Sequence, residues 1–396
     1  MKRFLALLLA ATMLLALCAC GKTEEPTPPD TSSKDAEDTA VTQDTTGEEP
    51  EKDIKLGIIF YSKDDSLGQL VYSYLNYAAE VIDGLELQWA LGSFDANSQV
   101  ADAENLIAAG CDGIMALTLD DLAMQQIANV CNENGVYFQV MFRAPSSEET
   151  KAILETYDYY VGYAIEDTVA TSYQTIEILA EKGISKIAIG TNTHSSTSTM
   201  RNSGMESACE DLGIERVAQF DLGSDVSSVQ ADLQNVLDSY SDIEAVWLMS
   251  GSQGIADICV NTLRAHKEAT GKTVALMTFD PFDAMAQAFE DGILYGDVGG
   301  QAPLCLAAFS AIYNAIDGHP LSEEKVAIQF PFLILTSSED LDFFENYYNN
   351  TEIQLYDEEI IKSMLYHFNP DVDLVELQEF WSSFSMDWIK DEMASR

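Results

Sequence analysis

The chain has 396 residues, with 66 acidic and 20 basic side chains, and a formal net charge of −46. This charge excludes a nucleic-acid binder and a protein that docks on anionic lipid through a basic patch, because both need clustered Lys and Arg. Hydrophobic residues make up 47% of the chain, which excludes disorder throughout, and the length suggests about two domains. Residues 53–396 alone carry a net charge of −41, so the acidity belongs to the part that folds.

The first twenty residues are typical of an export leader. Lys2 and Arg3 precede an apolar stretch at residues 4–18, which is shorter than the roughly 20 residues that a membrane span needs. The stretch ends in Leu17-Cys18-Ala19-Cys20-Gly21, which resembles a bacterial lipobox with Cys20 as the lipidated residue. We therefore expect a signal peptide at 1–20 and an extracytoplasmic protein anchored to the cell membrane through lipid on Cys20. A plain secretory signal with incidental cysteines is the alternative.

Residues 21–52 are rich in Thr, Pro, Glu and Asp, with ten acidic and three basic side chains. They contain almost no large apolar residue, so burial cannot offset the entropy lost on ordering them. This composition predicts a disordered acidic tether between the lipid and the folded part.

From residue 54 onward, short apolar runs alternate with amphipathic stretches, of which 99–109, 168–181 and 228–239 are clear helices. Strands that alternate with helices predict an α/β fold with parallel sheets covered on both faces. Ten strands are many for one compact domain, and 143–157 is a plausible boundary, so we expect two doubly wound lobes. The predicted strands are 56–61, 85–91, 113–117, 136–141, 159–161, 186–189, 217–221, 245–249, 274–279 and 295–298.

In doubly wound sheets, ligands sit beyond the carboxyl ends of the strands, and with two lobes the natural site is the cleft between them. The segments that follow the predicted strands are polar. Only five arginines lie beyond the leader, and two of them, Arg143 and Arg201, fall in these segments. Because Arg offers a planar fork of donors, we expect these two to contact a ligand, with pairing to nearby carboxylates as the alternative.

Nothing in the sequence indicates catalysis or a metal site. The five cysteines of the mature chain and the four histidines show no metal-ligand spacing, and we find no nucleophile elbow, phosphate-binding loop or dinucleotide fingerprint. We expect no enzyme activity, no metal and no cofactor. The cysteines read as buried free thiols, although one disulfide is possible in an exported protein.

Several segments together resemble the bacterial periplasmic sugar-binding proteins of the ribose-binding kind (type I), here as a substrate-binding lipoprotein. The likeness covers about residues 54–334. It is carried, in order, by KLGIIFYSKDD, DANSQVADAENLIAAGCDGIMALTLDD, MRNSGM and TFDPFDAMAQAFEDGILYGDVGGQAP. It departs from the family at Phe142, where the family has Asp, and at Ser250-Gly251-Ser252-Gln253, where the family has Asn.

The resemblance implies a role for each matching residue. Phe60 and Tyr61 would pack on a sugar ring, whereas Phe60 as strand-end core is the alternative. Asp280 would bond sugar hydroxyls, or act only as a helix N-cap before Pro281. Gln301 would also bond sugar hydroxyls, or else only brace the hinge between the lobes. The implied ligand-binding set is Phe60, Tyr61, Arg143, Arg201, Ser252, Asp280 and Gln301.

The resemblance also implies two lobes joined by a hinge, the type I periplasmic binding protein fold. The N-terminal lobe would comprise 54–160 plus about 302–330, and the C-terminal lobe 161–301. A third crossover and a C-terminal helical extension would follow at 331–396, where 374–388 has helical spacing. The extension would dock on the lobes, or else present a surface to a membrane partner.

The implied function is that of a solute-binding protein that delivers a sugar-like small molecule to an ABC permease, as a monomer without nucleic acid. The alternatives are a sensor of the same fold that presents its ligand to a membrane kinase or chemoreceptor, and an enzyme that acts on a bound sugar.

Overall fold

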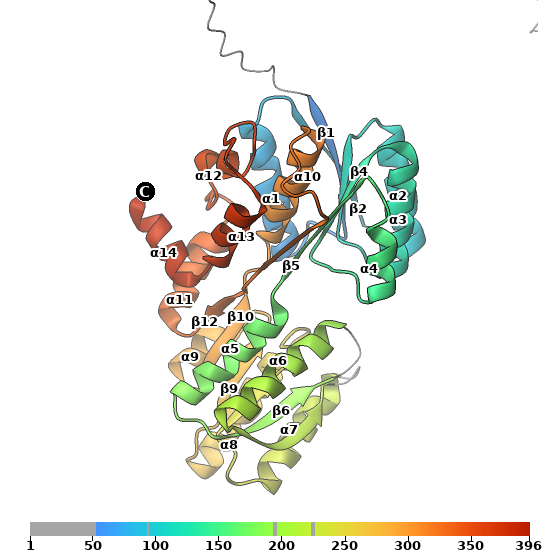
Figure 1. Ribbon diagram of the computed structural model, residues 1–396. Helices are drawn as coiled ribbons and strands as arrows, with labels where there is room; N and C mark the ends of the chain where they lie inside the picture. Colours follow the sequence, from blue (N-terminus) through green and yellow to red (C-terminus); the bar gives the residue numbers. More distant parts are fainter. Residues whose placement is uncertain (1–52, 93–94, 193–195, 223–225) are drawn as a thin grey trace, which may run out of the picture. The chain divides into compact units, whose positions relative to one another are not determined.

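The computed structural model describes residues 53–92, 95–192, 196–222 and 226–396 (Figure 1). The predicted signal peptide, the lipidation residue Cys20 and the predicted tether lie outside the described residues. The described chain is built around two six-stranded sheets, with a helix between each pair of successive strands from β1 to β11.

The first sheet has the strand order β11-β5-β4-β3-β1-β2, and all of its neighbouring strands are parallel. Its interior strands are almost fully buried, which is typical of a parallel sheet covered on both faces. Its strands are β1 (Ile54–Phe60), β2 (Leu85–Leu91), β3 (Gly113–Ala116), β4 (Tyr137–Met141), β5 (Tyr160–Glu166) and β11 (Val326–Phe330).

The second sheet has the order β12-β10-β9-β8-β6-β7 and is parallel except for the pair β10 and β12. Its strands are β6 (Lys186–Thr191), β7 (Glu215–Asp221), β8 (Ala245–Leu248), β9 (Ala275–Phe279), β10 (Leu294–Gly299) and β12 (Leu333–Leu335). Two largely parallel sheets with flanking helices confirm the predicted doubly wound α/β class.

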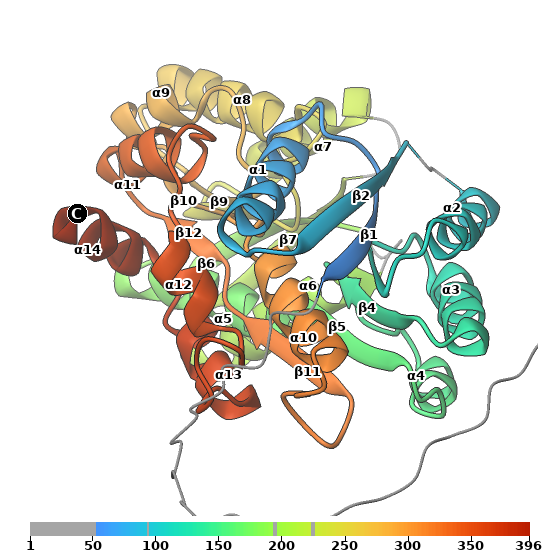
Figure 2. The ribbon, with the colours of Figure 1, turned by 90° about the horizontal axis from the view of Figure 1, so that it is seen from above.

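The helices of the first sheet lie on both of its faces. Figures 1 and 2 show α1 and α10 on one face, and α2, α3 and α4 on the other. Aspartates begin three of these helices, because Asp65, Asp95 and Asp120 each accept a hydrogen bond from a backbone N–H of the first turn. The bounds are α1 (Ser66–Val81), α2 (Ala96–Ala108), α3 (Asp121–Asn134), α4 (Glu148–Leu154) and α10 (Leu304–Ile316).

The helices of the second sheet form two packed pairs, because α5 lies along α6 and α7 lies along α8. The helices around this sheet are α5 (Thr168–Glu181), α6 (Ser196–Leu212), α7 (Val226–Ser239), α8 (Ile255–Thr270) and α9 (Met285–Glu290).

The chain passes between the sheets three times: from β5 to α5, from β10 to α10 and from β11 to β12. The first passage lies later than the sequence placed it. We expected the second lobe to begin at residue 161, but β5 continues to Glu166 and pairs with β4 through Met141 and Ala164. The reason is that the sequence predicted a strand of only three residues here, whereas the ladder extends over the whole of β5.

The C-terminal segment, residues 337–396, folds as five short helical pieces. The predicted helical run 374–388 is interrupted at Ser383–Ser385, because Ser385 caps a new helix by accepting the backbone N–H of Trp388 at 3.1 Å. The pieces are α11 (Ser338–Phe343), the π-helical turn η1 (Phe344–Tyr348), α12 (Glu358–Ser363), α13 (Leu374–Ser382) and α14 (Met386–Ser395).

Aromatic side chains dock this segment on the sheets. Trp381 is fully buried, and its ring stacks on Phe330 of β11 at 5.0 Å and lies 5.7 Å from Tyr356. Asn314 of α10 binds the segment at both ends of its side-chain amide, donating to the Met364 carbonyl at 2.9 Å and accepting the Tyr366 N–H at 2.7 Å. The buried Trp381 ring and the two hydrogen bonds of the Asn314 amide indicate that the C-terminal segment is part of the folded core.

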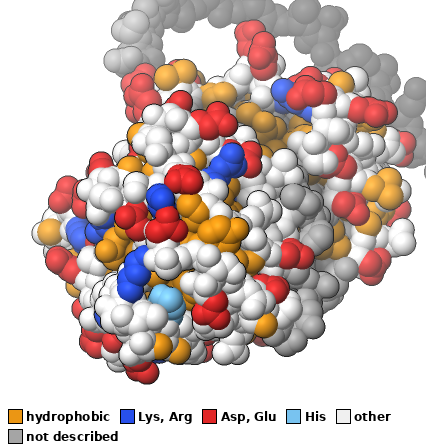
Figure 3. All heavy atoms as spheres, turned by 90° about the horizontal axis from the view of Figure 1, so that it is seen from below, with side chains coloured by type: hydrophobic (Ala, Val, Ile, Leu, Met, Phe, Trp, Pro, Cys, Tyr) orange, Lys and Arg blue, Asp and Glu red, His pale blue; other side chains and the backbone are white. Residues whose placement is uncertain are grey.

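Three further features of the described residues bear on function. The five cysteines among them are buried free thiols. No helix in the described part is long and apolar enough to cross a membrane. Figure 3 shows acidic side chains spread over the face seen there, with a few basic ones among them.

Candidate functional site

Arg201 lies in a buried position on α6, with only 7% of the residue exposed. Its Nη1 donates to the Met249 carbonyl at 2.8 Å, and its guanidinium carbon lies 4.2 Å from the ring centroid of Phe279 and 5.9 Å from that of Phe332. Its Nε has no hydrogen-bond partner among the described residues. Arg201 is therefore held in place by aromatic rings and one carbonyl, with donor capacity left over.

Asp280 directly follows β9 and lies 3.8 Å from Arg201, measured from Oδ2 to Nη1. The same oxygen accepts the Ser250 hydroxyl at 2.6 Å, and Ser250 shares a hydrogen bond with Ser252 at 2.9 Å. The next helix, α9, begins at Met285 and is capped by Ala284, so the N-cap alternative for Asp280 is wrong. Arg201, Asp280 and Ser252 thus belong to one polar cluster beyond the carboxyl ends of β8 and β9.

Arg143 follows β4 by two residues and is exposed. Its Nη1 donates to the carbonyl of Phe142 at 3.1 Å, and no carboxylate among the described residues pairs with it. The alternative that Arg143 pairs with a nearby carboxylate is therefore not seen among the described residues. Arg143 offers most of its donors outward.

Glu166 is the residue that sequence reasoning missed. It ends β5, is 8% exposed, and its Oε2 has no hydrogen-bond partner among the described residues. Burial raises the pKa of the Glu166 carboxyl, whereas the nearby charges of Arg201 and Arg143 lower it and Asp280 raises it. The charges of Arg143 after β4 and of the Arg201–Asp280 pair in the second sheet therefore both act on the Glu166 carboxyl.

The two aromatic residues predicted after the first strand differ in exposure. Phe60 is 1% exposed, and its ring lies 4.6 Å from that of Tyr61 and 5.8 Å from that of Phe142. Tyr61 is partly exposed and donates its hydroxyl to Asp65 at 2.7 Å, and burial together with this bond raises its pKa. Phe60 is therefore a core residue at the end of the strand, which is the alternative that the sequence left open. Tyr61 has the more accessible ring of the two.

Gln301 lies in the passage from β10 to α10, where its carbonyl accepts the Leu304 N–H at 3.1 Å. The next residue, Ala302, donates its N–H to the Tyr348 hydroxyl at 2.9 Å, which ties this passage to the C-terminal segment. Among the described residues, no hydrogen bond joins the Gln301 side chain to the Arg201 cluster. Its position between the sheets fits the hinge alternative as well as the ligand one.

Asp297 on β10 is a second buried carboxyl close to this cluster. It is fully buried, and neither of its side-chain oxygens has a hydrogen-bond partner among the described residues. Burial raises the pKa of Asp297 well above its usual value, the neighbouring Asp280 raises it further, and Arg201 lowers it. A carboxyl in this environment holds its proton well above the usual range of aspartate.

Comparison with known proteins shows the family to which the chain belongs. The model of the family described as Periplasmic binding protein domain matches residues 56–319. The chain belongs to this family. Its two parallel sheets with flanking helices are the type I periplasmic binding protein fold, as the sequence resemblance implied. A search of the curated proteins found no match.

Solved structures show the same family fold in solute-binding proteins of ABC transporters. One is from Bacillus halodurans with bound myo-inositol, at 20% identity and a TM-score of 0.55, covering 75% of this chain and 98% of that one. Another is from Actinobacillus succinogenes with bound D-allose, at 14% identity and a TM-score of 0.58, covering 74% and 100%. A periplasmic sugar-binding protein from Pseudomonas fluorescens has 13% identity and a TM-score of 0.63, covering 85% and 99%.

Proposed function

We propose that this protein is a lipid-anchored extracytoplasmic solute-binding protein that captures a sugar or related polyol and delivers it to an ABC importer. The observation that carries the proposal is the Arg201–Asp280–Ser250 cluster beyond the carboxyl ends of the second sheet, in a chain of the periplasmic binding protein family. In doubly wound sheets this edge is where ligands bind.

The chemistry of these residues suits a neutral polyol. Arg143 and Arg201 donate, Asp280 and Glu166 accept, and charged groups make the stronger hydrogen bonds to hydroxyls. The partly exposed ring of Tyr61 can cover a C–H face of the ligand. The two lobes would close on the ligand by a hinge motion that shifts a pre-existing equilibrium.

A binding screen tests the ligand proposal. The purified mature protein is titrated calorimetrically with myo-inositol, D-allose and D-arabinose, and its thermal unfolding is followed with each compound. A ligand at 100 times its Kd stabilises a protein by about 2.7 kcal/mol, which a melting curve detects. We expect one of these neutral compounds to bind and to be recovered unchanged, whereas chemical turnover would contradict a binding role.

Anchoring is tested separately by replacing the predicted lipid acceptor. In cells, the Cys20→Ser variant should lose lipid labelling and move from the membrane fraction to the soluble fraction, because one thioether-linked lipid is then missing. Cys18→Ser is the matched control and should stay with the membrane. Equal fractionation of the two variants would overturn the lipidation proposal without touching the ligand site.

A further inference from the structure

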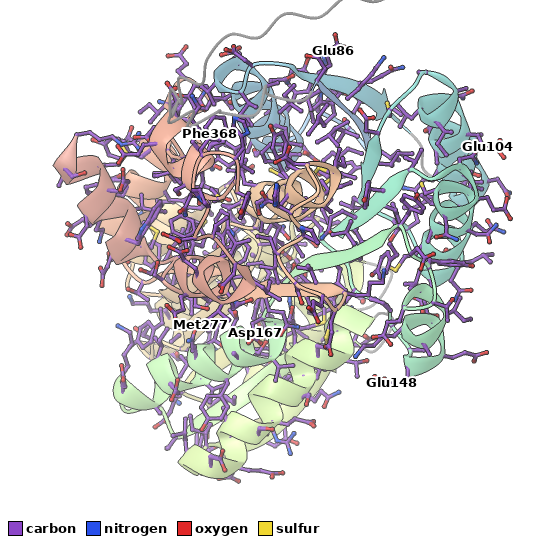
Figure 4. All side chains as sticks on the ribbon, turned by 45° about the horizontal axis from the view of Figure 1, so that its top comes forward. Glu86, Glu104, Glu148, Asp167, Met277 and Phe368 are labelled. Atoms are coloured by element: carbon purple, nitrogen blue, oxygen red, sulfur yellow. The ribbon has the colours of Figure 1, made fainter. Side chains whose placement is uncertain are left out.

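A buried carboxyl with one unpaired oxygen lies where the chain leaves the first sheet. Glu166 is the last residue of β5, where it pairs with Phe330 of β11, and it is 8% exposed. Its Oε2 is buried and makes no hydrogen bond within the described part of the chain. Figure 4 labels the next residue, Asp167, which caps α5.

Three charged groups from three elements act electrostatically on this carboxyl. They are Arg143 after β4, Arg201 on α6 and Asp280 after β9. The parallel register explains the first of these, because Met141 pairs with Ala164 and Glu166 therefore lies just beyond the end of β4. Glu166 thus lies level with Arg143, beyond the carboxyl end of β4.

The two arginines act on Glu166 through their charge without forming an ion pair with it. Buried polar groups in native proteins are normally hydrogen-bonded, and a buried carboxyl without a partner is costly. Two donors with unused capacity stand close to an acceptor with unused capacity. A ligand that carries both donors and acceptors would satisfy all three at once.

We propose that Glu166 is a ligand-binding residue that accepts hydrogen bonds from hydroxyl groups of a neutral polyol, while Arg143 and Arg201 donate to oxygens of the same ligand. This inference rests on the proposed function and adds to it a specificity-determining residue. Neighbouring hydroxyls suit the arrangement because each can donate to Glu166 and accept from an arginine. A carboxylate on the ligand does not suit it, because Glu166 accepts but offers no matching donor when ionised.

The isosteric Glu166→Gln variant is the central test, because an amide keeps the volume but loses the charge. Calorimetric titration with the compound that wild type binds best among myo-inositol, D-allose and D-arabinose should show Kd rising about tenfold or more in Glu166→Gln, and about 100-fold in Glu166→Leu. Asp340→Asn is the matched control. Asp340 lies on α11, is 7% exposed and pairs with Lys390 of α14 at 2.7 Å. Its replacement should leave Kd within about twofold of the wild-type value.

The pH dependence separates ligand contact from a structural role. Hydroxyl donors favour the ionised carboxyl, and burial raises the pKa of Glu166. Wild-type binding should therefore weaken as the pH falls from neutral towards that raised pKa. The part of this dependence that comes from Glu166 should disappear in Glu166→Gln. D-Galacturonate should gain affinity relative to the neutral compound in the variant.

The outcomes are distinct. If wild type binds and Glu166→Gln binds equally well with the same pH dependence, Glu166 is only a buried structural acid and the inference fails alone. If wild type binds none of the neutral compounds, the proposed ligand class fails and the inference fails with it. Circular dichroism of each variant shows whether a loss of binding reflects unfolding.

Discussion

Phe142 and Asp280 occupy equivalent positions in the two sheets. Each directly follows a strand, β4 or β9, and each has a positive φ, 64° and 73°. Each donates its backbone N–H at 2.9 Å to a carbonyl of the neighbouring strand, Ala164 or Val298. A left-handed conformation costs a residue other than glycine roughly 1–3 kcal/mol, so the surroundings must impose it twice. Both sheets therefore turn the chain in the same way where the candidate ligand residues begin.

Arg201→Ala should reduce affinity for the best neutral polyol by about 100-fold or more, because it removes buried, charge-assisted donors beside Asp280. Arg201→Lys should recover only part of that loss, since an ammonium cannot reproduce the planar fork on Phe279. Calorimetric titration measures both. Arg216→Ala, which removes an arginine paired with Glu206 at 2.7 Å, is the control and should bind normally. Full affinity in Arg201→Ala would remove this residue from the site.

Arg143→Ala should separate binding from stability. Arg143 is exposed, and its hydrogen bond among the described residues goes to the Phe142 carbonyl, so we expect the free energy of unfolding in urea to change by no more than about 0.5 kcal/mol. Affinity for the ligand should nevertheless fall about tenfold or more. Arg264→Ala provides the opposite pattern, with lost stability from its bond to Asp291 and unchanged affinity. A variant of Arg143 that binds as well as wild type would contradict the assignment.

Asp297→Asn should change how stability depends on pH. The pKa of Asp297 is raised in the folded protein, so the folded state holds the proton more tightly than the unfolded chain does. Its stabilising contribution is complete below the unfolded value near 3.8 and is lost as the pH rises towards the folded pKa. The neutral variant avoids that loss, so its stability relative to wild type should increase from pH 5 to pH 8. Urea unfolding at both values measures this difference.

The comparison for Asp297 is Glu181→Gln, which neutralises an exposed acid at the end of α5. Its stability relative to wild type should stay nearly constant between the two pH values. If Asp297→Asn behaves in the same way, the buried carboxyl is ionised at no cost and our account of its environment is wrong.

Trp381→Ala should destabilise the whole protein by about 3–5 kcal/mol, because it empties a fully buried site that stacks on Phe330. Val375→Ala on the same helix is the control, since Val375 is 65% exposed and its loss should be close to neutral. Urea unfolding measures both. Equal stability of the two variants would revive the alternative in which the C-terminal segment serves as a partner surface.

The sequence predicted the first ten strands to within a few residues, except β5, because their apolar runs are long and bounded by turns. It missed β11 and β12. In β11, Val326, Ile328 and Phe330 are buried while Ala327 and Gln329 are exposed, which is the alternation of an edge strand. That alternation can be read from the sequence. Because only Pro331 and Phe332 separate β11 from β12, the sequence does not indicate that the two strands belong to different sheets.

The site was only partly predictable for a related reason. Arg201, Asp280 and Ser252 could be found because they follow apolar runs, and the structure brings them together. Glu166 could not, since a carboxylate at the end of an apolar run looks like the start of a loop, and Asp167 after it looks like an ordinary N-cap. Only the ladder of β5 shows that Glu166 is still inside the sheet.

The late position of β11 and β12 bears on the order in which the protein can be assembled. Neither sheet acquires its last strand until residues beyond 325 are present, because β11 flanks β5 and β12 flanks β10. A chain that stops earlier would leave the largely buried strands β5 and β10 as the edges of the two sheets. An apolar unpaired edge is a template for aggregation. C-terminal truncations that remove β11 and β12 should therefore yield insoluble protein before they yield a weaker binder.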